Sequence, residues 1–511
     1  MKSEMLRKKC SIKFVNYVIL AIVVSILCLF NLYSSPIRNE VPDIDSSVFQ
    51  IMGKGLLNKQ IIYKELFDHK GPVVYLINAI AYIISPSIGL FMIETVTTYI
   101  GALFIYKLSK LFLNDRLSLI SSIVYLVPIF SYITGGNFTE EYAIVFTNIA
   151  LYNILQIFLK NEYNKKSNWI IIGVTFAINL MIKPTYVAIW VAFGMVQLIC
   201  SIKDKKIKEL LKQIIYMLIG ILVIMIPILI YLVIKSDIKD FIDAYIVMNM
   251  KYSKNTIIQK IEVFGKLLND YNGSIFLVLI FISNLLTILD KKIKWRIKSI
   301  ITIFNVIGLV LMGWAANSYS HYLIQFAPII ALNFIILVFI LKEKINEKRF
   351  LQNIKEQLPI KLIYFCFTIL TILLAMLYNR KINIKALEHR ITYNEYKRNY
   401  IMEIGKYLSD TDELFVLGND VGCYVLLDKQ PRFKYFFQTP IFMYDRNILI
   451  ETEKYVEKNK PKVILKAMSD YEELFDKNIK KINEILSNEY EEHDKIMFKY
   501  YVLKENVSKW K

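Results

Sequence analysis

Asp45–Tyr75, read as DSSVFQIMGKGLLNKQIIYKELFDHKGPVVY, is the stretch that decides how this chain is organised. It follows the first long apolar segment, Ile12–Leu32, and leads directly into the next one. Acidic, basic and imidazole side chains lie close together in it, with Asp45 at its start and Asp68-His69-Lys70 near its end. Polar groups at the edge of a bilayer cost free energy unless they have partners or a function. We therefore expect this loop to carry the chemistry of the protein.

The composition is that of a polytopic membrane protein. Of 511 residues, 55% are hydrophobic, and the mean hydropathy is +0.41, which is too apolar for a soluble chain of this size. The net charge of +19 would suit a nucleic-acid partner, but the positive residues cluster in short loops between apolar runs. These clusters are Lys2–Lys9, Lys107–Arg116, Lys160–Lys166, Lys203–Lys212, Lys291–Lys298 and Lys342–Arg349. That placement follows the positive-inside rule, so we expect no nucleic-acid partner.

Cysteines and short motifs identify no cofactor. Cys28, Cys200 and Cys366 fall inside apolar runs, and the chain has no CxxC, HExxH or GxxxxGK[ST] spacing. The sequence therefore identifies no cofactor with certainty. Whether the protein needs a divalent metal ion is left open. Met1–Leu32 has a basic start and an apolar run long enough to span a bilayer, which favours an uncleaved first helix with a cytoplasmic N-terminus.

Apolar runs and lysine-rich loops together predict about eleven crossings. The expected spans are Ile12–Leu32, one crossing within Val73–Tyr106 after a break near Ser85-Pro86, Leu117–Ile133, Tyr142–Phe158, Trp169–Ile182, Tyr186–Ile202, Ile214–Ile234, Ser274–Leu289, Ile300–Trp314, Tyr322–Leu341 and Ile360–Tyr378. Two long outer loops are expected at Tyr33–Pro72 and Lys235–Tyr271. An odd number of crossings places Asn379–Lys511 outside the cell.

The last block has a different character, with higher charge and shorter apolar runs. Glu413–Leu417, Lys462–Lys466 and Met497–Leu503 predict strands among segments of helical periodicity. We therefore expect a membrane domain at residues 1–378 and a small extracytoplasmic α/β domain at 379–511. Gly418-Asn419-Asp420 lacks the pattern of a nucleotide site and is interpreted as a plain turn after a strand.

Four polar elements are expected on the outer side of the membrane. They are the first loop, the turn Gly135–Glu141, the junction Lys183-Pro184-Thr185, and Asn317–Tyr322 with His321. An acid that can accept a proton, together with cations that can hold a phosphate, suits transfer from a lipid-linked phosphate donor at the membrane surface.

These residues resemble the GT-C superfamily of polytopic glycosyltransferases, in particular the bacterial branch related to the dolichyl-phosphate-mannose and aminoarabinose transferases. The first loop carries the resemblance, with an acidic residue after the first span, then F-x-x-x-G, then Y-x-x-x-F-D-H-K-G-P. Three further motifs follow in the family's order: Thr139-Glu140, Lys183-Pro184-Thr185, and His321-Tyr322 with Pro328. The resemblance covers residues 10–345 and is specific as a set.

The resemblance implies roles for eight residues. Asp45 would be the catalytic base, and direct displacement with one base implies inversion at the anomeric carbon. Lys70, His69, Lys183 and His321 would bind the donor phosphate. Glu140, Asp43 and Tyr63 would contact the acceptor or a cation.

Each role has a structural alternative. Asp45 also fits a helix N-cap, and Lys70 a lysine at a helix end whose charge reaches the interface. Glu140 also fits an ordinary first helical turn. Relatives often have Asp-Glu where this chain has Asp45-Ser46, which lacks the second carboxylate. Asp43, two residues before Asp45, could take the place of that carboxylate, so Asp43 is the alternative base.

The sequence thus predicts a plasma-membrane glycosyltransferase that uses a polyprenyl-phosphate sugar donor. The acceptor would be a glycan, a glycolipid or a protein of the cell envelope, and the partners include membrane lipid. The alternative function is a transporter or flippase of lipid-linked sugars, which should place ionisable residues at mid-membrane. A non-catalytic assembly protein would leave the convergence of acid, histidine and lysine in the first loop unexplained.

Overall fold

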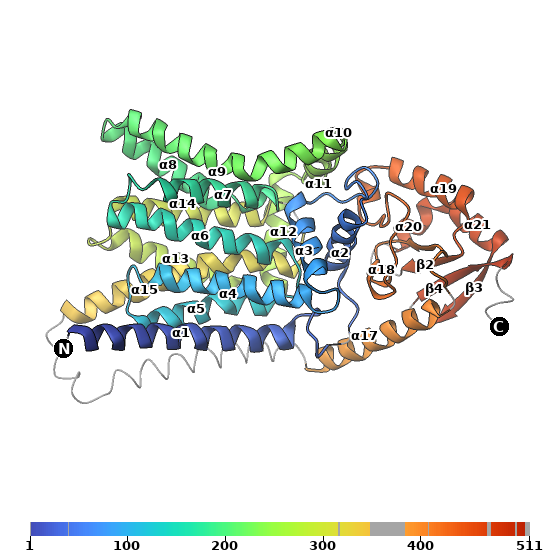
Figure 1. Ribbon diagram of the computed structural model, residues 1–511, viewed down its shortest axis with the longest axis horizontal. Helices are drawn as coiled ribbons and strands as arrows, with labels where there is room; N and C mark the ends of the chain where they lie inside the picture. The colour runs from blue at the N-terminus through green and yellow to red at the C-terminus, as the bar shows by residue number, and fades with distance from the viewer. Residues whose placement is uncertain are drawn as a thin grey trace.

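The structure is a computed structural model that describes residues 2–38, 40–314, 317–347, 384–406, 408–467, 472–495 and 498–505. Up to residue 347 it is helical (Figure 1). The long helices are α1 (Lys2–Asn31), α2 (Ile44–Leu57), α3 (Pro72–Ile84), α4 (Gly89–Ser109), α5 (Asp115–Tyr132), α6 (Thr139–Lys160), α7 (Lys166–Leu180), α8 (Ala188–Lys203), α9 (Ile207–Ile234), α12 (Ile257–Asp270), α13 (Ser274–Leu289), α14 (Trp295–Met312) and α15 (Phe326–Glu347). The short helical segments between them are η1 (Pro184–Tyr186), α10 (Ile238–Phe241), η2 (Ile242–Val247), α11 (Met248–Tyr252) and η3 (Ser320–Gln325).

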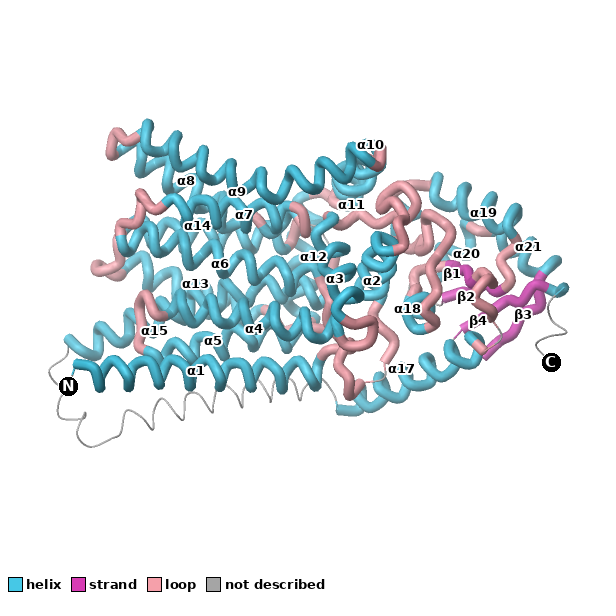
Figure 2. The backbone as a smooth tube through the Cα atoms, in the orientation of Figure 1, coloured by secondary structure: helices cyan, strands magenta, loops and turns pink. Residues whose placement is uncertain are grey.

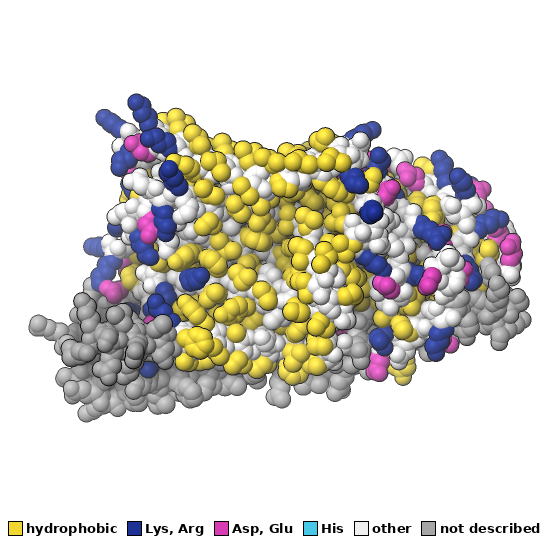
Figure 3. All heavy atoms as spheres, in the orientation of Figure 1, with side chains coloured by type: hydrophobic (Ala, Val, Ile, Leu, Met, Phe, Trp, Pro, Cys, Tyr) yellow, Lys and Arg dark blue, Asp and Glu magenta, His cyan; other side chains and the backbone are white. Residues whose placement is uncertain are grey.

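Most of the long helices run side by side in a bundle, and the face of this bundle that Figure 3 shows is apolar. Lys and Arg side chains gather at its two ends, whereas the middle is covered by hydrophobic side chains (Figure 3). Helix α9 exposes Leu222 and Ile230, among other apolar residues, along most of its length. A helix with backbone hydrogen bonds satisfied internally can hold such a surface against lipid. The chain is therefore a multi-pass membrane protein.

Ten of the expected spans each coincide with a helix, and the break near Ser85-Pro86 separates α3 from α4. By length and composition, six helical segments in the described part of the chain qualify as spans by themselves, and the pair α12 and α13, bent by 106°, would make a seventh. The expected span Ile360–Tyr378 lies outside the described residues. Eleven crossings therefore stay a prediction.

Residues 384–505, called here the C-terminal part, contain a four-stranded sheet (Figure 2). Its elements are α17 (Ile384–Gly405), β1 (Leu414–Leu417), α18 (Gly422–Leu426), η5 (Ile441–Met443), α19 (Asn447–Asn459), β2 (Val463–Ala467), α20 (Glu472–Asn478), α21 (Lys480–Glu489), β3 (Tyr490–Lys495) and β4 (Phe498–Leu503). The strand order is β1-β2-β4-β3, with β1 parallel to β2 and the other neighbours antiparallel.

The sequence does not predict the strand β3. Its residues, YEEHDK, are mostly charged, a composition that seldom predicts a strand but suits the edge of a sheet. Because β3 takes the edge, β4 pairs with a neighbour on each side, β2 on one and β3 on the other. The division at residues 378 and 379 falls outside the described residues, so the domain boundary also stays a prediction.

The C-terminal part packs on residues 33–71 at one end of the bundle. Gln430 Nε2 donates to the carbonyl oxygen of Ile51 at 3.1 Å, and Phe67 N donates to that of Lys434 at 2.9 Å. The loops at the opposite end connect α4 to α5, α6 to α7, α8 to α9 and α13 to α14, and they carry the lysine clusters (Figure 1). The positive-inside rule predicts that this opposite end is cytoplasmic.

This orientation can be tested with single cysteines in a chain whose own cysteines are replaced. Lys206→Cys lies in the lysine-rich loop before α9, and Thr411→Cys lies on the exposed surface of the C-terminal part. In intact cells we expect a membrane-impermeant thiol reagent to label Thr411→Cys alone, with Lys206→Cys reacting after permeabilisation. Labelling of both positions in intact cells would contradict the orientation.

Candidate functional site

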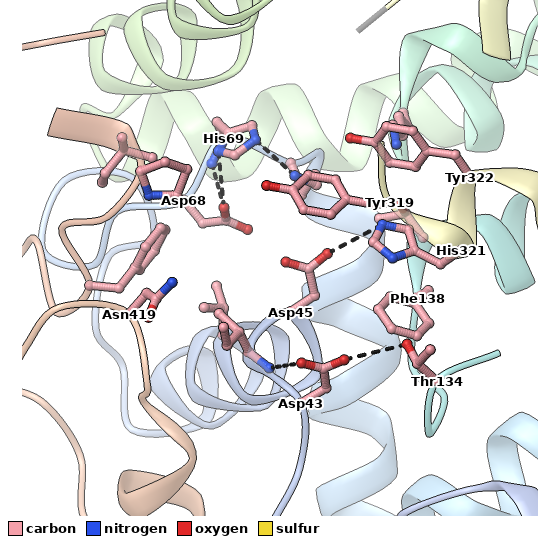
Figure 4. A pocket seen from close by; sticks show the side chains of 18 of the residues that line it. Asp43, Asp45, Asp68, His69, Thr134, Phe138, Tyr319, His321, Tyr322 and Asn419 are labelled. Atoms are coloured by element: carbon pink, nitrogen blue, oxygen red, sulfur yellow. Dashed lines mark hydrogen bonds and ion pairs between the residues drawn. The ribbon is translucent and has the colours of Figure 1, made fainter. Parts of the chain in front are cut away.

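A cavity of about 240 Å³ lies where the bundle meets the C-terminal part (Figure 4). Its wall is built from α2, the loop before α3, the turn before α6, the α7–η1 junction, η3 and two segments of the C-terminal part. Six of the eight residues singled out in the sequence line it: Asp43, Asp45, His69, Lys70, Lys183 and His321. These six residues come from three of the four polar elements, and Phe138 and Thr139 of the fourth, the turn Gly135–Glu141, also line the cavity.

The two aspartates at the start of α2 have different surroundings. Asp43 is the N-cap, and its Oδ1 accepts a hydrogen bond from Ile44 N at 2.7 Å. Its Oδ2 lies 3.5 Å from Thr134 Oγ1. Because Asp43 caps the helix, Asp45 is not needed for that purpose, and its carboxylate points into the cavity with 39% of the side chain exposed (Figure 4). Asp43, and not Asp45, is therefore the N-cap of α2.

His321 faces Asp45 across a short gap. Its Nε2 lies 3.9 Å from Asp45 Oδ2. The imidazole is stacked between the rings of Phe138, 4.4 Å away, and Tyr319, 5.6 Å away. Two parallel neighbouring rings fix the plane of the imidazole, so His321 presents its edge to the Asp45 carboxylate.

Asp68, His69 and Lys70 form a chain of contacts on the other side of the cavity. Lys70 Nζ lies 2.8 Å from His69 Nε2, and because an ammonium can only donate, this ring nitrogen must accept. The neutral ring then carries its proton on Nδ1, which lies 3.5 Å from Asp68 Oδ1. Burial, aided by Lys70 and Lys183, lowers the pKa of His69 well below its usual value. His69 is therefore uncharged and holds the Lys70 ammonium in place.

Asp68 completes this chain from the buried side. Its Oδ2 accepts a hydrogen bond from Tyr75 Oη at 2.8 Å, and its Oδ1 accepts one from His69 N at 2.7 Å. Burial raises the pKa of Asp68 above its usual value, while Lys70 and the Tyr75 hydrogen bond oppose that rise. The sequence motif contained Asp68, but no separate role was predicted for it.

The backbone around Lys70 is held from two directions. Tyr63 donates its hydroxyl hydrogen bond to the Lys70 carbonyl oxygen at 2.9 Å. Tyr75 Oη, whose proton goes to Asp68, lies 3.1 Å from the same carbonyl oxygen. At Gly71 an added Cβ would lie 1.9 Å from the Met181 carbonyl oxygen, so only glycine allows the loop to pack on the end of α7. Tyr63, expected to contact the acceptor or a cation, is fully buried outside the cavity lining, and its hydroxyl bonds to the Lys70 backbone.

Lys183 is compensated inside the protein. Its Nζ lies 2.7 Å from Glu140 Oε1 and 4.1 Å from the centre of the Tyr322 ring. Burial lowers the pKa of Lys183, and the Glu140 carboxylate opposes that shift. Glu140 is itself 1% exposed, so this is a buried ion pair and not an ordinary first-turn acid in water. By contrast, the described partner of the Lys70 ammonium is a neutral imidazole.

Asn137 ties the walls of the cavity together. Its Nδ2 donates to Ser46 Oγ of α2 at 3.1 Å and to Asn78 Oδ1 of α3 at 2.9 Å. Its Oδ1 accepts from Tyr142 Oη of α6 at 2.7 Å, and its backbone N donates to Glu94 Oε1 of α4 at 2.5 Å. One buried side chain thus sets where Asp45 stands relative to the turn that carries Phe138.

The sequence of the chain matches one protein family over most of its length. Residues 5–385 match the family described as the competence-induced protein Ccs4 N-terminal domain. The chain belongs to this Ccs4 family. No curated protein matches it in sequence.

Comparison with solved structures shows the fold of this Ccs4-family member. The crystal structure of ArnT from Cupriavidus metallidurans bound to undecaprenyl phosphate has a TM-score of 0.61 at 11% identity, covering 96% of this chain and 97% of ArnT. The Archaeoglobus fulgidus oligosaccharyltransferase in its apo form has a TM-score of 0.51 at 11% identity, covering 96% of this chain and 74% of that one. These likenesses concern the fold, and they confirm the fold that the resemblance to the GT-C superfamily predicts.

Sequence reasoning missed several residues of the cavity in this Ccs4-family chain. Phe138, Tyr252 and Tyr319 are aromatic and carry no signal that separates them from core residues. The C-terminal part contributes Asn419, Phe437 and the segment 439–441, although Asn419 was interpreted as part of a plain turn. Among the described residues, no three His, Cys, Asp or Glu side chains are grouped closely enough to hold a metal ion.

The buried Lys183–Glu140 pair can be tested by removing one charge or both. Glu140→Gln leaves the Lys183 ammonium buried without a counter-charge, which we expect to reduce the free energy of unfolding by about 3–5 kcal/mol. The loss should shrink as the pH is raised, because deprotonation of Lys183 then removes the charge from the folded state. The measurement is thermal unfolding in detergent, followed by tryptophan fluorescence.

The double variant Glu140→Gln, Lys183→Met is the control for this test. It carries no unpaired charge and should recover most of the lost stability. Equal losses in the single and double variants would show that the ion pair does not couple the two residues.

Proposed function

We propose that the protein is a glycosyltransferase that moves a sugar from a polyprenyl-phosphate donor to a cell-envelope acceptor at the outer face of the membrane. One observation carries this proposal: a single cavity holds a carboxylate facing its interior, Asp45, and an ammonium fixed by a neutral histidine, Lys70. A base and a preorganised cation are the two groups that displacement of a lipid phosphate by a hydroxyl requires.

In the proposed reaction Asp45 is the base. The acceptor hydroxyl oxygen attacks the anomeric carbon, its proton passes to the Asp45 carboxylate, and the bond from that carbon to the phosphate oxygen breaks. Attack opposite the departing phosphate inverts the configuration at the anomeric carbon. His321, 3.9 Å from Asp45, orients the carboxylate from the side of Phe138.

Lys70 offsets the negative charge that develops on the departing phosphate. His69 positions this ammonium because its Nε2 accepts from it, and Asp68 in turn lies against the far side of the ring. Direct phosphate contacts by His69, Lys183 and His321 stay predictions. Contacts of Glu140, Asp43 and Tyr63 with the acceptor or a cation also stay predictions. Among these residues, Lys183 is already compensated by Glu140, which favours Lys70 as the principal phosphate contact.

The proposed setting is a bacterial plasma membrane, with the C-terminal part on the outer side as an α/β domain above about eleven crossings. The likeness in fold to ArnT supports a polyprenyl-phosphate donor, because that protein was crystallised with undecaprenyl phosphate. The cavity lies at the end of the bundle opposite the lysine-rich loops, where an acceptor of the cell envelope would meet it.

Transport of lipid-linked sugars is the second candidate, and Glu94 is the residue on which it would depend. Glu94 is the main ionisable side chain within an expected span, and an ion or substrate path would need such a group facing an open channel. It is instead 1% exposed, with Oε1 accepting from Asn137 N and Oε2 accepting from Ser34 Oγ. Glu94 therefore serves the turn beside the cavity, and this favours the enzyme.

The base is tested by Asp45→Asn, which keeps the shape of the side chain but removes its ability to accept a proton. We expect normal expression and membrane insertion with transfer reduced by roughly 10²-fold or more. The variant is expressed in a deletion strain, and the measurement is the amount of polyprenyl-linked sugar that accumulates in the lipids of that strain. An active variant rescues the strain and prevents the accumulation.

Asp43→Asn is the matched variant for the base. Asparagine is also a good N-cap, so α2 should form normally and the effect should be much milder. Loss of transfer in Asp43→Asn together with full activity in Asp45→Asn would move the base to Asp43.

The cation is tested by comparing Lys70→Ala with Lys70→Arg. Removal of the charge should cost about 2–4 kcal/mol of transition-state stabilisation, whereas arginine keeps the charge and should retain much more activity. The measurement is kcat/KM for transfer in membranes. Wild-type activity in Lys70→Ala would leave Lys70 with a purely structural role at the interface.

A further inference from the structure

The outer wall of the cavity comes from the C-terminal part, and none of the roles assigned above uses it. Asn419 follows β1, and Phe437, Thr439, Pro440 and Ile441 precede or begin η5. In the close view Asn419 lies on one side of the cavity and His321 on the other, with Asp45 between them (Figure 4). This wall therefore faces the position where the reacting sugar would lie.

A buried glutamine holds the two segments of this wall in fixed relation. Gln438 is fully buried, and its backbone N donates to the Gly418 carbonyl oxygen at 2.7 Å. Its side-chain Oε1 accepts from Gly418 N, also at 2.7 Å. Gly418 has a φ of +122°, a conformation that favours glycine. Because Asn419 and Thr439 are the next residues after this clamped pair, their relative positions are set by it.

The same wall is fixed against the start of α2. At Gly422, four residues after the clamp, an added Cβ would lie 2.5 Å from Val41 Cγ1 and 3.2 Å from the Pro42 carbonyl oxygen. The C-terminal part thus packs closely on the residues that immediately precede Asp43 and Asp45. Asn419 and Thr439 are consequently held in place relative to the proposed base.

Both residues have hydrogen-bonding capacity that a ligand could use. Thr439 is 1% exposed, and its hydroxyl oxygen has no hydrogen-bond partner among the described residues. Asn419 is 9% exposed and lines the cavity with an amide that can both donate and accept. A buried hydroxyl without a partner costs free energy, and a bound polar group that hydrogen-bonds to the hydroxyl removes this cost. Phe437, Pro440 and Ile441 add apolar surface beside them.

We propose that Asn419 and Thr439 form a subsite that hydrogen-bonds the hydroxyl groups of a sugar ring. Donor and acceptor atoms next to apolar surface match a sugar, which presents hydroxyl groups at its edge and C–H groups on its faces. This inference rests on the proposed glycosyltransferase function and assigns specificity to the C-terminal part. The ring belongs either to the donor or to a glycan acceptor, and the experiment separates the two.

The test uses the full-length protein in lipid nanodiscs, with Asn419→Ala, Thr439→Val and the conservative Thr439→Ser. Binding is measured for undecaprenyl phosphate and for undecaprenyl phosphate linked to glucose, galactose, mannose or N-acetylglucosamine. If the ring is the donor's, Asn419→Ala and Thr439→Val bind the sugar-bearing lipid preferred by wild type about tenfold more weakly, the effect of one lost hydrogen bond. Bare undecaprenyl phosphate should bind as in wild type, and Thr439→Ser should keep its affinity.

The second arm titrates the cell-envelope fraction of a deletion strain as acceptor. Unchanged donor affinity with an acceptor KM raised about tenfold assigns the subsite to the acceptor. Asn459→Ala and Thr411→Val, exposed on the same part of the chain and away from the cavity, are the controls.

The outcomes separate the subsite from the function on which it rests. Wild-type donor affinity and wild-type acceptor KM in both Asn419→Ala and Thr439→Val would overturn the subsite while leaving the enzyme intact. Failure of the wild-type protein to bind any of these lipids would overturn the proposed function, and the subsite with it.

Discussion

The arrangement of the cavity depends on one buried polar side chain, Asn137, in a turn that requires unusual backbone conformations. Gly135, Gly136 and Asn137 all have positive φ, and the two glycines pack against Tyr33 and Glu94 so closely that a Cβ could not be accommodated. The turn lets the Asn137 side chain reach α2, α3 and α6 together. Each of those bonds is buried, so losing a partner would leave an unsatisfied group where water cannot replace it.

A second constraint is electrostatic, since two lysines must be kept near each other in a largely buried site. The structure resolves this in two ways. Lys183 is neutralised by the buried carboxylate of Glu140, whereas Lys70 is held by the uncharged ring of His69. The first arrangement removes net charge from the site, and the second leaves a cation oriented by a neutral neighbour. Only the second arrangement leaves positive charge available to an anionic ligand.

The C-terminal part is joined to this site by specific contacts with residues 33–71. Gly422 lies against Val41 and Pro42, and Gln430 bonds to the backbone of α2. A cavity enclosed by both parts excludes more water than the bundle end alone, which strengthens the electrostatic interactions inside it. The membrane bundle thus supplies the charged groups, and the C-terminal part supplies the wall that encloses them.

The sequence by itself determined the membrane character, the positions of ten helical segments and six residues that line the cavity. Those features depend on local composition, on runs of apolar residues and on short motifs. Each of these is a property of one continuous stretch of the chain. Only the tertiary structure decided that Asp43 caps α2 while Asp45 faces His321, that Glu140 neutralises Lys183, and that Tyr63 supports the Lys70 backbone. It also decided that Asn419 and Thr439 reach the same cavity. The physical reason is that the local sequence around each of these residues is compatible with more than one role. Which role the residue takes depends on the side chains that distant segments of the chain bring into contact with it.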